Sequence, residues 1–105
     1  MRRKLIKKLD AMLATFEIAD RISKDDVEAA KRFVDAVEKA CAFLAEFPDS
    51  GEIVRTRHRR LRGLRAWPVQ GFRNYLILFL PKDRVVEILA VIHGARNLRY
   101  VLREL

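Results

Sequence analysis

Two apolar runs separated by a short polar turn dominate the C-terminal half of the sequence. Residues 72–80 and 85–92 are both of strand length, and residues 81–84 between them include proline, lysine, aspartate and arginine. Apolar runs on either side of such a segment are typical of an antiparallel β-hairpin. The second run leads into His93 and Arg96, so an imidazole and a guanidinium follow a strand end. Polar groups at the end of a rigid strand are well placed to act on a partner.

The N-terminal half has the pattern of two amphipathic helices. Apolar residues spaced by three and four positions form one stripe over residues 5–22 and a longer one over residues 27–44. Asp25, with Glu28 three residues later, has the form of a capping box that begins the second helix. Pro48 and Gly51 end it. Two helices joined by a short polar turn predict an antiparallel helical hairpin. The first stripe consists of Leu5, Leu9, Met12, Phe16, Ala19 and Ile22.

Three further segments complete the predicted fold. Residues 64–69 form a strand in which Pro68 favours an edge or irregular position. Residues 2–6 are a candidate first strand, although they lack clear alternation. A C-terminal stripe is too short for a stable free helix and needs a surface, on this domain or on a partner. We predict one α+β domain over residues 1–105, a helical hairpin packed on a mainly antiparallel sheet of three to four strands. The stripe consists of Leu98, Val101, Leu102 and Leu105.

Charge is distributed unevenly along the chain. Residues 1–50 carry ten basic and ten acidic side chains, whereas residues 51–105 carry twelve basic and four acidic ones, so the net charge of +8 lies in the second half. A field of one sign favours a polyanionic partner, either nucleic acid or an acidic protein segment. The densest cluster contains arginine and no lysine, and guanidinium groups suit phosphate and carboxylate. A solvated loop that promotes solubility is the alternative. The cluster comprises Arg55, Arg57, Arg59, Arg60, Arg62 and Arg65.

The remaining composition excludes several classes of protein. Cys41 is the single cysteine and cannot form an internal disulfide, and its apolar helical context indicates a buried residue. No segment reaches the roughly 20 uncharged apolar residues that cross a bilayer. No signal-peptide pattern follows the basic N-terminus. We therefore expect a cytoplasmic protein without a membrane partner, metal or cofactor.

Several short motifs occur in an order and spacing that together are specific. They are Phe16-Glu17-Ile18-Ala19-Asp20-Arg21-Ile22, Ala29-Ala30-Lys31-Arg32-Phe33, Leu44-Ala45-Glu46-Phe47-Pro48, Phe72-Arg73 and His93-Gly94-Ala95-Arg96. Over roughly residues 16–98 the sequence resembles the toxins of the RelE/ParE superfamily, which belong to bacterial type II toxin–antitoxin modules. The ParE branch fits best.

The ribonuclease branch of this superfamily would give three residues a catalytic role. The resemblance implies that Arg73 and Arg96 would stabilise the scissile phosphate. It also allows His93 to act as a general acid. The structural alternatives are ion pairs of the two arginines with acidic groups such as Glu87, and backbone hydrogen bonds for His93.

The chain departs from the ribonuclease pattern at two places. Residues 64–69 hold no lysine or carboxylate that could serve as a base. The family's tyrosine position falls near Leu102, which cannot transfer a proton, and Tyr100 comes two residues early. These departures argue against a complete ribonuclease site, and we assign no catalytic residue firmly.

The ParE branch implies a toxin that binds and inhibits DNA gyrase and is neutralised by a ParD-like antitoxin. Such antitoxins usually wrap a helix and an extended segment over the helical hairpin and the sheet. The alternatives are a RelE-like, ribosome-dependent mRNA endoribonuclease and a small RNA-binding or ribosome-associated domain, which the charge would suit. For antitoxin or polyanion binding we propose the six clustered arginines with Trp67, and for target binding Arg96, Leu98, Tyr100 and Leu102.

Overall fold

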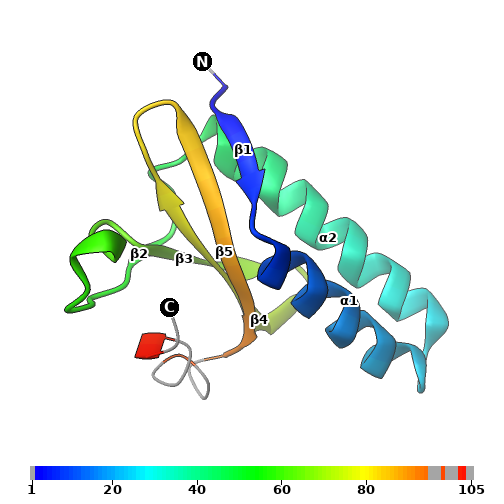
Figure 1. Cartoon of the computed structure of the whole chain (residues 1–105). Coiled ribbons are helices and arrows are strands. Elements are labelled where there is room, and N and C mark those ends of the chain that lie inside the picture. The colour runs from blue at the N-terminus through cyan, green and yellow to red at the C-terminus, as the bar shows by residue number, and fades with distance from the viewer. Residues whose placement is uncertain (1, 95–97, 99–101, 104–105) are drawn as a thin grey trace.

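The structure is a computed structural model that describes residues 2–94, 98, 102 and 103. Its helices lie as an antiparallel pair against one face of a single sheet (Figure 1), which confirms the predicted α+β architecture. The elements are β1 (Lys4–Lys7), α1 (Leu9–Ser23), α2 (Val27–Glu46), β2 (Glu52–Ile53), the 3-10 helix η1 (Arg59–Leu61), β3 (Arg65–Val69), β4 (Phe72–Pro81) and β5 (Val85–His93).

The β4–β5 hairpin forms the centre of the sheet, as predicted. The strand order is β1-β5-β4-β3-β2, so the described chain has five strands where three to four were expected. Leu76 pairs with Ile92 and Pro81 with Val86 in antiparallel register. The turn is closed by the Lys82 N–H, which donates to the Val85 carbonyl at 2.7 Å.

The first strand shows why the sheet is mixed rather than purely antiparallel. β1 pairs in parallel with β5, with Lys4 opposite Val85. The Lys4 N–H donates to the Arg84 carbonyl at 3.0 Å, and the Lys8 N–H donates to the Ile88 carbonyl at 2.9 Å. The strand therefore exists, over residues 4–7 rather than 2–6. Its pairing partner β5 lies far along the chain, so the local pattern of apolar and polar residues does not reveal this strand.

The face that α1 buries differs from the predicted stripe. Its buried residues are Ala11, Thr15, Ile18 and Ala19. Leu9 and Phe16, two members of the predicted apolar stripe, are 67% and 58% exposed, so the buried face of α1 follows that stripe only in part. The cause is close packing of α1 against both α2 and β5, which small side chains permit and bulky ones prevent. Leu5 lies in β1 and packs against the core from there.

The second helix follows its predicted stripe but begins with a different cap. The Asp26 carboxylate accepts a hydrogen bond from the Ala29 N–H at 3.1 Å, so Asp26 is the N-cap and the capping box on Asp25 is wrong. The Asp25 N–H donates to the Ile22 carbonyl at 3.1 Å and so still belongs to the end of α1. The buried residues of α2 are Ala30, Phe33, Val37, Ala40, Cys41, Leu44 and Ala45.

Both faces of the sheet carry a hydrophobic cluster. The first cluster lies under the helices, where the ring of Phe33 meets Phe72 at 5.2 Å and Tyr75 at 5.3 Å between centroids. The second lies on the opposite face, under the segment between β2 and β3. Leu98 and Leu102 pack against this second cluster, so the described part of the tail rests on the domain itself. Val101 and Leu105 lie outside the described residues.

Pro68 occupies the irregular position that was expected of it. β3 spans residues 65–69 and pairs on one side with β4 and on the other with the two-residue β2. The register shifts between Pro68 and Val69. Because proline has no N–H to donate, this break in the ladder accommodates it. Beyond β3, the sheet ends at the two-residue edge strand β2.

Candidate binding surfaces

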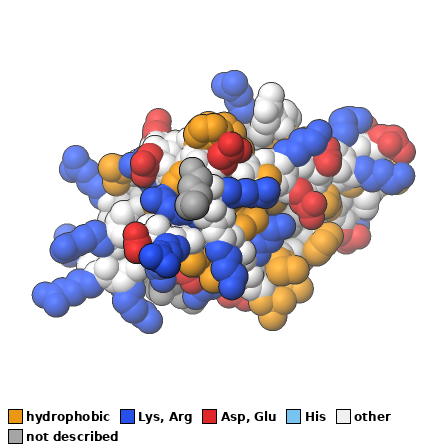
Figure 2. Space-filling model, turned by 90° about the horizontal axis from the view of Figure 1, so that it is seen from above, with side chains coloured by type: hydrophobic (Ala, Val, Ile, Leu, Met, Phe, Trp, Pro, Cys, Tyr) orange, Lys and Arg blue, Asp and Glu red, His pale blue; other side chains and the backbone are white. Residues whose placement is uncertain are grey.

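Five arginines form a fixed basic surface that we call the arginine platform: Arg55, Arg57, Arg59, Arg60 and Arg62. All five side chains are exposed. Leu61 and Leu64, which alternate with them, are buried against the second face of the sheet. Figure 2 shows Lys and Arg side chains projecting at the end of the molecule that carries η1. The segment is therefore attached to the sheet by its leucines and presents its arginines to solvent.

Arg65 of the predicted cluster, and Trp67, which was proposed with it for antitoxin or polyanion binding, have a different environment. The Arg65 Nη1 donates to the backbone carbonyls of Asp49 and Gly51, at 2.9 and 3.2 Å. Trp67 is half-buried and stacks on Phe43, with ring centroids 5.2 Å apart and planes at 22°. Both side chains lie on the helix-covered side of the sheet. Arg65 and Trp67 thus hold the fold together in addition to any contact with a partner.

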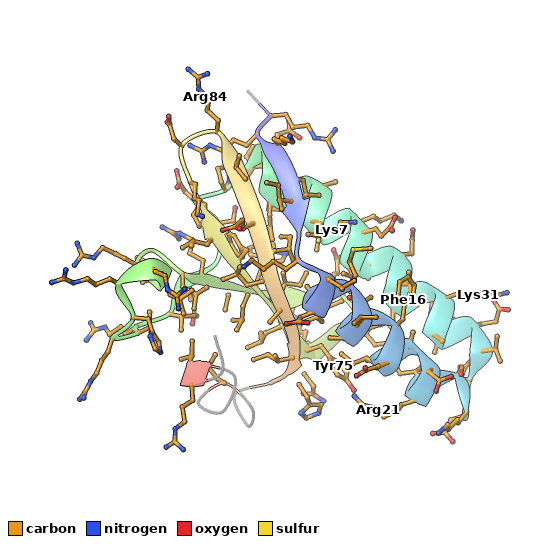
Figure 3. The ribbon with its side chains drawn as sticks, in the orientation of Figure 1. Lys7, Phe16, Arg21, Lys31, Tyr75 and Arg84 are labelled. Atoms are coloured by element: carbon orange, nitrogen blue, oxygen red, sulfur yellow. The ribbon has the colours of Figure 1, made fainter. Side chains whose placement is uncertain are left out.

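The sheet end opposite the β4–β5 turn carries the residues considered for catalysis. Tyr75 pairs with His93 across the two strands, and their rings meet edge to face with centroids 5.0 Å apart. The Nζ of Lys82 lies 2.7 Å from Oε1 of Glu87, and these two residues form an ion pair. Arg73 forms no ion pair among the described residues, so its suggested pairing with Glu87 is wrong. Arg73 is exposed. In Figure 3, Tyr75 and Arg84 mark the two ends of the hairpin.

The imidazole and the arginine platform lie on opposite faces of the sheet. Tyr75 contacts Phe33 of α2, and paired residues in adjacent strands point to the same face, so His93 lies on the helical side. The platform is carried on the other face by Leu61 and Leu64. The structure therefore does not bring His93 together with the platform. Arg96 and Tyr100 lie outside the described residues.

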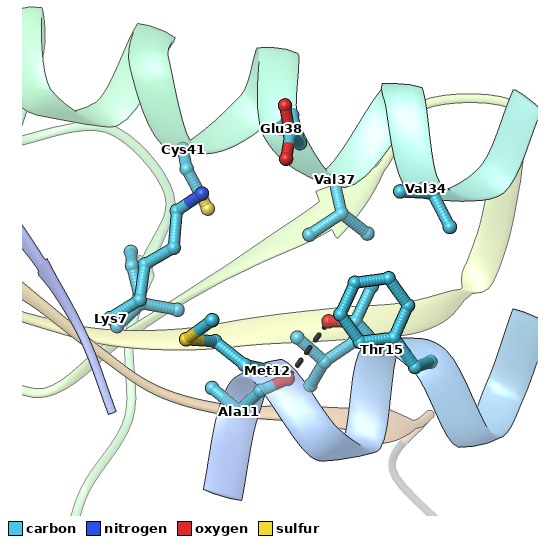
Figure 4. Close-up of a pocket in the computed structure, with 11 residues that line it drawn as sticks. Lys7, Ala11, Met12, Thr15, Val34, Val37, Glu38 and Cys41 are labelled. Atoms are coloured by element: carbon cyan, nitrogen blue, oxygen red, sulfur yellow. Dashed lines mark hydrogen bonds between the residues drawn. The ribbon is translucent and has the colours of Figure 1, made fainter. Parts of the chain in front are cut away.

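A groove between α1 and α2, which we call the helical groove, is an apolar depression on the helical side of the molecule. It encloses about 60 Å³, and Figure 4 shows Lys7 pointing across it toward Cys41. At its floor the Thr15 hydroxyl donates to the Ala11 carbonyl at 2.8 Å. Met12 and Phe16 form its exposed rim, and Leu9 and Leu13 continue the apolar surface along α1. Its lining includes Met12, Thr15, Phe16, Val34, Val37 and Cys41.

Cys41 is the titratable group whose chemistry the groove changes. Burial raises the pKa of its thiol to about 11, with a smaller opposing effect from the Lys7 ammonium and a further rise from Glu38. The thiol is therefore protonated at neutral pH and poorly nucleophilic. It contributes packing rather than chemistry.

The sequence predicted one apolar face for α1 and an antitoxin over the helical hairpin, but it did not locate the helical groove or show which apolar residues of α1 stay exposed. A signal was present in the residue sizes. Ala11, Thr15 and Ala19 are small and share one face, whereas Leu9, Leu13 and Phe16 follow the i, i+4, i+7 spacing of another. Where a helix packs closely on a sheet, the small face is the one that fits. The bulky face is then left exposed.

Within residues 2–94, 98, 102 and 103, no group of three or more His, Cys, Asp or Glu side chains could hold a metal ion. Neither of the two α-helices that the structure describes has the length and hydropathy needed to cross a membrane.

Comparison with known families agrees with this architecture. The family model for the ParE toxin of the type II toxin–antitoxin system parDE matches residues 6–98. The chain belongs to the ParE toxin family. The RelE/ParE resemblance seen in the sequence, with ParE as the better branch, is thereby confirmed.

A solved structure shares the fold at low sequence identity. It is described as a chromosomal ParDE toxin–antitoxin system from P. aeruginosa, and it superimposes with a TM-score of 0.70 at 16% identity. The match covers 89% of this chain and 97% of that one. Among curated proteins, no relative matches this ParE-family chain at a significant level.

Proposed function

We propose that this ParE-family chain is the toxin of a type II pair and that a cognate, ParD-like antitoxin covers its helical groove. The observation that carries this proposal is the exposure of large apolar residues on α1, where Leu9, Leu13 and Phe16 are 67%, 49% and 58% exposed. A row of such residues beside a groove is unusual for a chain that works alone. An amphipathic antitoxin helix could bury it by laying its apolar face in the groove.

The target that best fits the family is DNA gyrase, inhibited by binding rather than by chemistry. Residues 64–69 supply no general base, and His93 lies on the opposite face from the arginine platform. A metal-free ribonuclease needs these groups together, and loss of one proton-transfer group typically costs about 10²–10⁴-fold in rate. For contact with the target we keep Arg96, Leu98, Tyr100 and Leu102 as candidates. Growth inhibition and plasmid stabilisation would follow from such a toxin.

The arginine platform would accelerate capture of an acidic antitoxin from a distance. Exposed charges raise the association rate more than they change affinity, and salt screens them. Replacing Arg57, Arg59 and Arg60 with Glu should therefore slow association and flatten its salt dependence. An unchanged rate and salt slope would show that these charges do not steer the antitoxin.

The antitoxin proposal is tested by co-expression with the product of the neighbouring reading frame. Leu13→Asp combined with Phe16→Asp places charge on the exposed apolar row without touching the core. The matched control is Val27→Asp, because Val27 is also 56% exposed but lies at the start of α2. We expect wild type and control to inhibit growth and to be rescued, and the double variant to inhibit growth without rescue. Rescue of the double variant would contradict the groove assignment.

The target is tested separately with purified protein. We expect inhibition of gyrase supercoiling and no cleavage of mRNA on ribosomes. Ribosome-dependent cleavage that disappears in His93→Ala, with supercoiling unaffected, would favour the RelE-like alternative instead.

A further inference from the structure

The arginine platform borders two open hollows on the face of the sheet opposite the helices. One encloses about 670 Å³ and is lined by Arg55, Thr56, Arg57, His58, Leu102 and Arg103. The other encloses about 390 Å³, shares residues 55–58 and adds Arg59 and Arg62. The segment 55–58 is therefore a ridge with cationic groups on both sides.

The backbone that carries these arginines is already ordered. The Val54 N–H donates to the Leu64 carbonyl at 2.8 Å, and the Leu61 N–H donates to the His58 carbonyl at 3.0 Å. Leu61 and Leu64 are 7% and 0% exposed beneath the segment. A ligand would not have to order this backbone on binding, which removes part of the entropic cost of association. The backbone of the platform is therefore preorganised for a ligand.

Within the described residues, no ion pair neutralises an arginine of the platform, and Glu87, which lines the same hollow as Arg60, is paired with Lys82. No Asp or Glu occurs between residues 53 and 82. The ion pairs within the described ranges are Lys31–Glu28, Lys39–Asp35 and Lys82–Glu87, none of which involves the platform. Five neighbouring guanidinium groups repel one another, and a polyanion would relieve that repulsion.

The composition of the surface favours nucleic acid over a protein partner. A protein interface needs an apolar core with aromatic or aliphatic anchors, whereas nucleic-acid interfaces are polar and strongly positive. The large hydrophobic residues that the described chain exposes lie on β1, the helices, the turn after α2 and β2, and Ile53 alone borders the platform. Leu61 and Leu64 of the platform segment are buried against the sheet and cannot contact a partner.

We infer that the arginine platform binds the phosphodiester backbone of nucleic acid. Each guanidinium presents a planar fork of donors that matches two phosphate oxygens. Backbone phosphates carry no sequence information, so binding should be insensitive to base sequence and sensitive to salt. The inference goes beyond the proposed antitoxin contact, which lies in the helical groove on the opposite face, because the platform only speeds the encounter with the antitoxin from a distance and is not where the antitoxin binds. One molecule could hold both ligands at once.

The test is a salt titration of binding with three labelled probes: a short DNA duplex, an RNA strand and polyglutamate of matched charge. The platform variant changes Arg55, Arg57, Arg59, Arg60 and Arg62 to Gln. The control variant changes five exposed cations of the two helices and the turn between them to Gln and so loses the same charge: Arg21, Lys24, Lys31, Arg32 and Lys39. A third variant changes the platform arginines to Lys, which keeps the charge but loses the fork. Cooperative melting confirms that each variant folds.

We expect wild type to bind nucleic acid with a log–log salt slope of about −0.7 to −0.9 per phosphate contacted. The platform variant should lose more than tenfold in affinity, and each arginine removed should reduce the slope by about 1. The helical control should keep its slope, and the Lys variant should keep the slope with weaker binding. Binding of DNA, of RNA or of both supports the inference and identifies the source of the phosphates.

Three results would overturn the inference. Equal losses in the platform and control variants would show that net charge alone is responsible. Polyglutamate binding as tight as nucleic acid binding would indicate an acidic protein ligand. An unchanged platform variant would exclude the platform altogether. The platform variant is also co-expressed with the antitoxin. Because the proposed antitoxin contact lies in the helical groove, neutralisation of the variant by the antitoxin would show that the toxin proposal stands whatever the platform binds.

Discussion

The guanidinium of Arg65 donates a hydrogen bond of 2.9 Å to the backbone carbonyl of Asp49, which lies just beyond the end of α2. The same Nη1 lies 3.2 Å from the Gly51 carbonyl. Both carbonyls belong to the connection between α2 and β2, outside any helix. Arg65 therefore ties the α2–β2 connection to β3.

Removing this side chain should lower stability. We expect Arg65→Ala to reduce the free energy of unfolding by about 1–3 kcal/mol, because hydrogen bonds from a charged donor are lost. Arg62→Ala, which removes a platform arginine, should change it by less than about 0.5 kcal/mol. Urea denaturation followed by circular dichroism measures both. Equal effects would mean that the Arg65 hydrogen bonds add nothing beyond an ordinary surface residue.

The start of α2 offers a matched pair of aspartates. Asp26 accepts the Ala29 N–H, whereas Asp25 makes no such cap. Asp26→Ala should therefore reduce the free energy of unfolding by about 1 kcal/mol. Asp25→Ala should have a smaller effect in the same denaturation experiment. The reverse order would restore the capping box that the sequence suggested.

Two glycines with positive φ separate backbone strain from steric clash. Gly51 has φ 82° and Gly71 has φ 85°. A Cβ at Gly51 would lie 2.4 Å from the Ala66 carbonyl oxygen, whereas a Cβ at Gly71 would meet nothing within 4 Å. Gly71→Ala should cost about 1–2 kcal/mol from conformation alone. Gly51→Ala should cost clearly more, because the backbone of β3 must also shift. Similar midpoints in thermal melts of the two variants would contradict this.

The elements that the sequence predicted well are those determined by local patterns. The hairpin of β4 and β5 follows from two apolar runs and a turn, and α2 follows from a periodic stripe with a stop at Pro48. The density of arginine over residues 55–65 was enough to predict the basic cluster. What local patterns do not determine is which face is covered. The parallel pairing of β1 and the exposure of Phe16 both depend on contacts with distant segments.

The candidate surfaces show the same limit. The sequence groups Arg65 with the other arginines, yet its register in β3 directs it to the carbonyls after α2. It also places His93 near a strand end without showing that Tyr75 faces it across the hairpin. Such roles arise from strand register and from which face of the sheet each segment covers. Neither is encoded in the spacing of one residue type.

The thiol of Cys41 provides a pH-dependent test of the helical groove. Burial raises its pKa from an ordinary value of 9.0 to about 11, so the protonated form is favoured in the folded state. Alkylation requires the thiolate. We expect iodoacetamide to label the native protein slowly at pH 8 and progressively faster toward pH 11, while the unfolded chain labels readily near pH 9. Occupation of the groove by antitoxin should slow native labelling further.

The same shift has a consequence for stability with a definite sign. A pKa raised in the folded state means that the unfolded chain loses its proton first as the pH increases. The stabilisation is therefore fully present below pH 9 and is lost progressively between pH 9 and about 11. Cys41→Ala cannot titrate there, so its unfolding free energy should fall less over this range than that of wild type. Parallel curves for the two proteins would show that Cys41 is not held as a buried thiol beneath the groove.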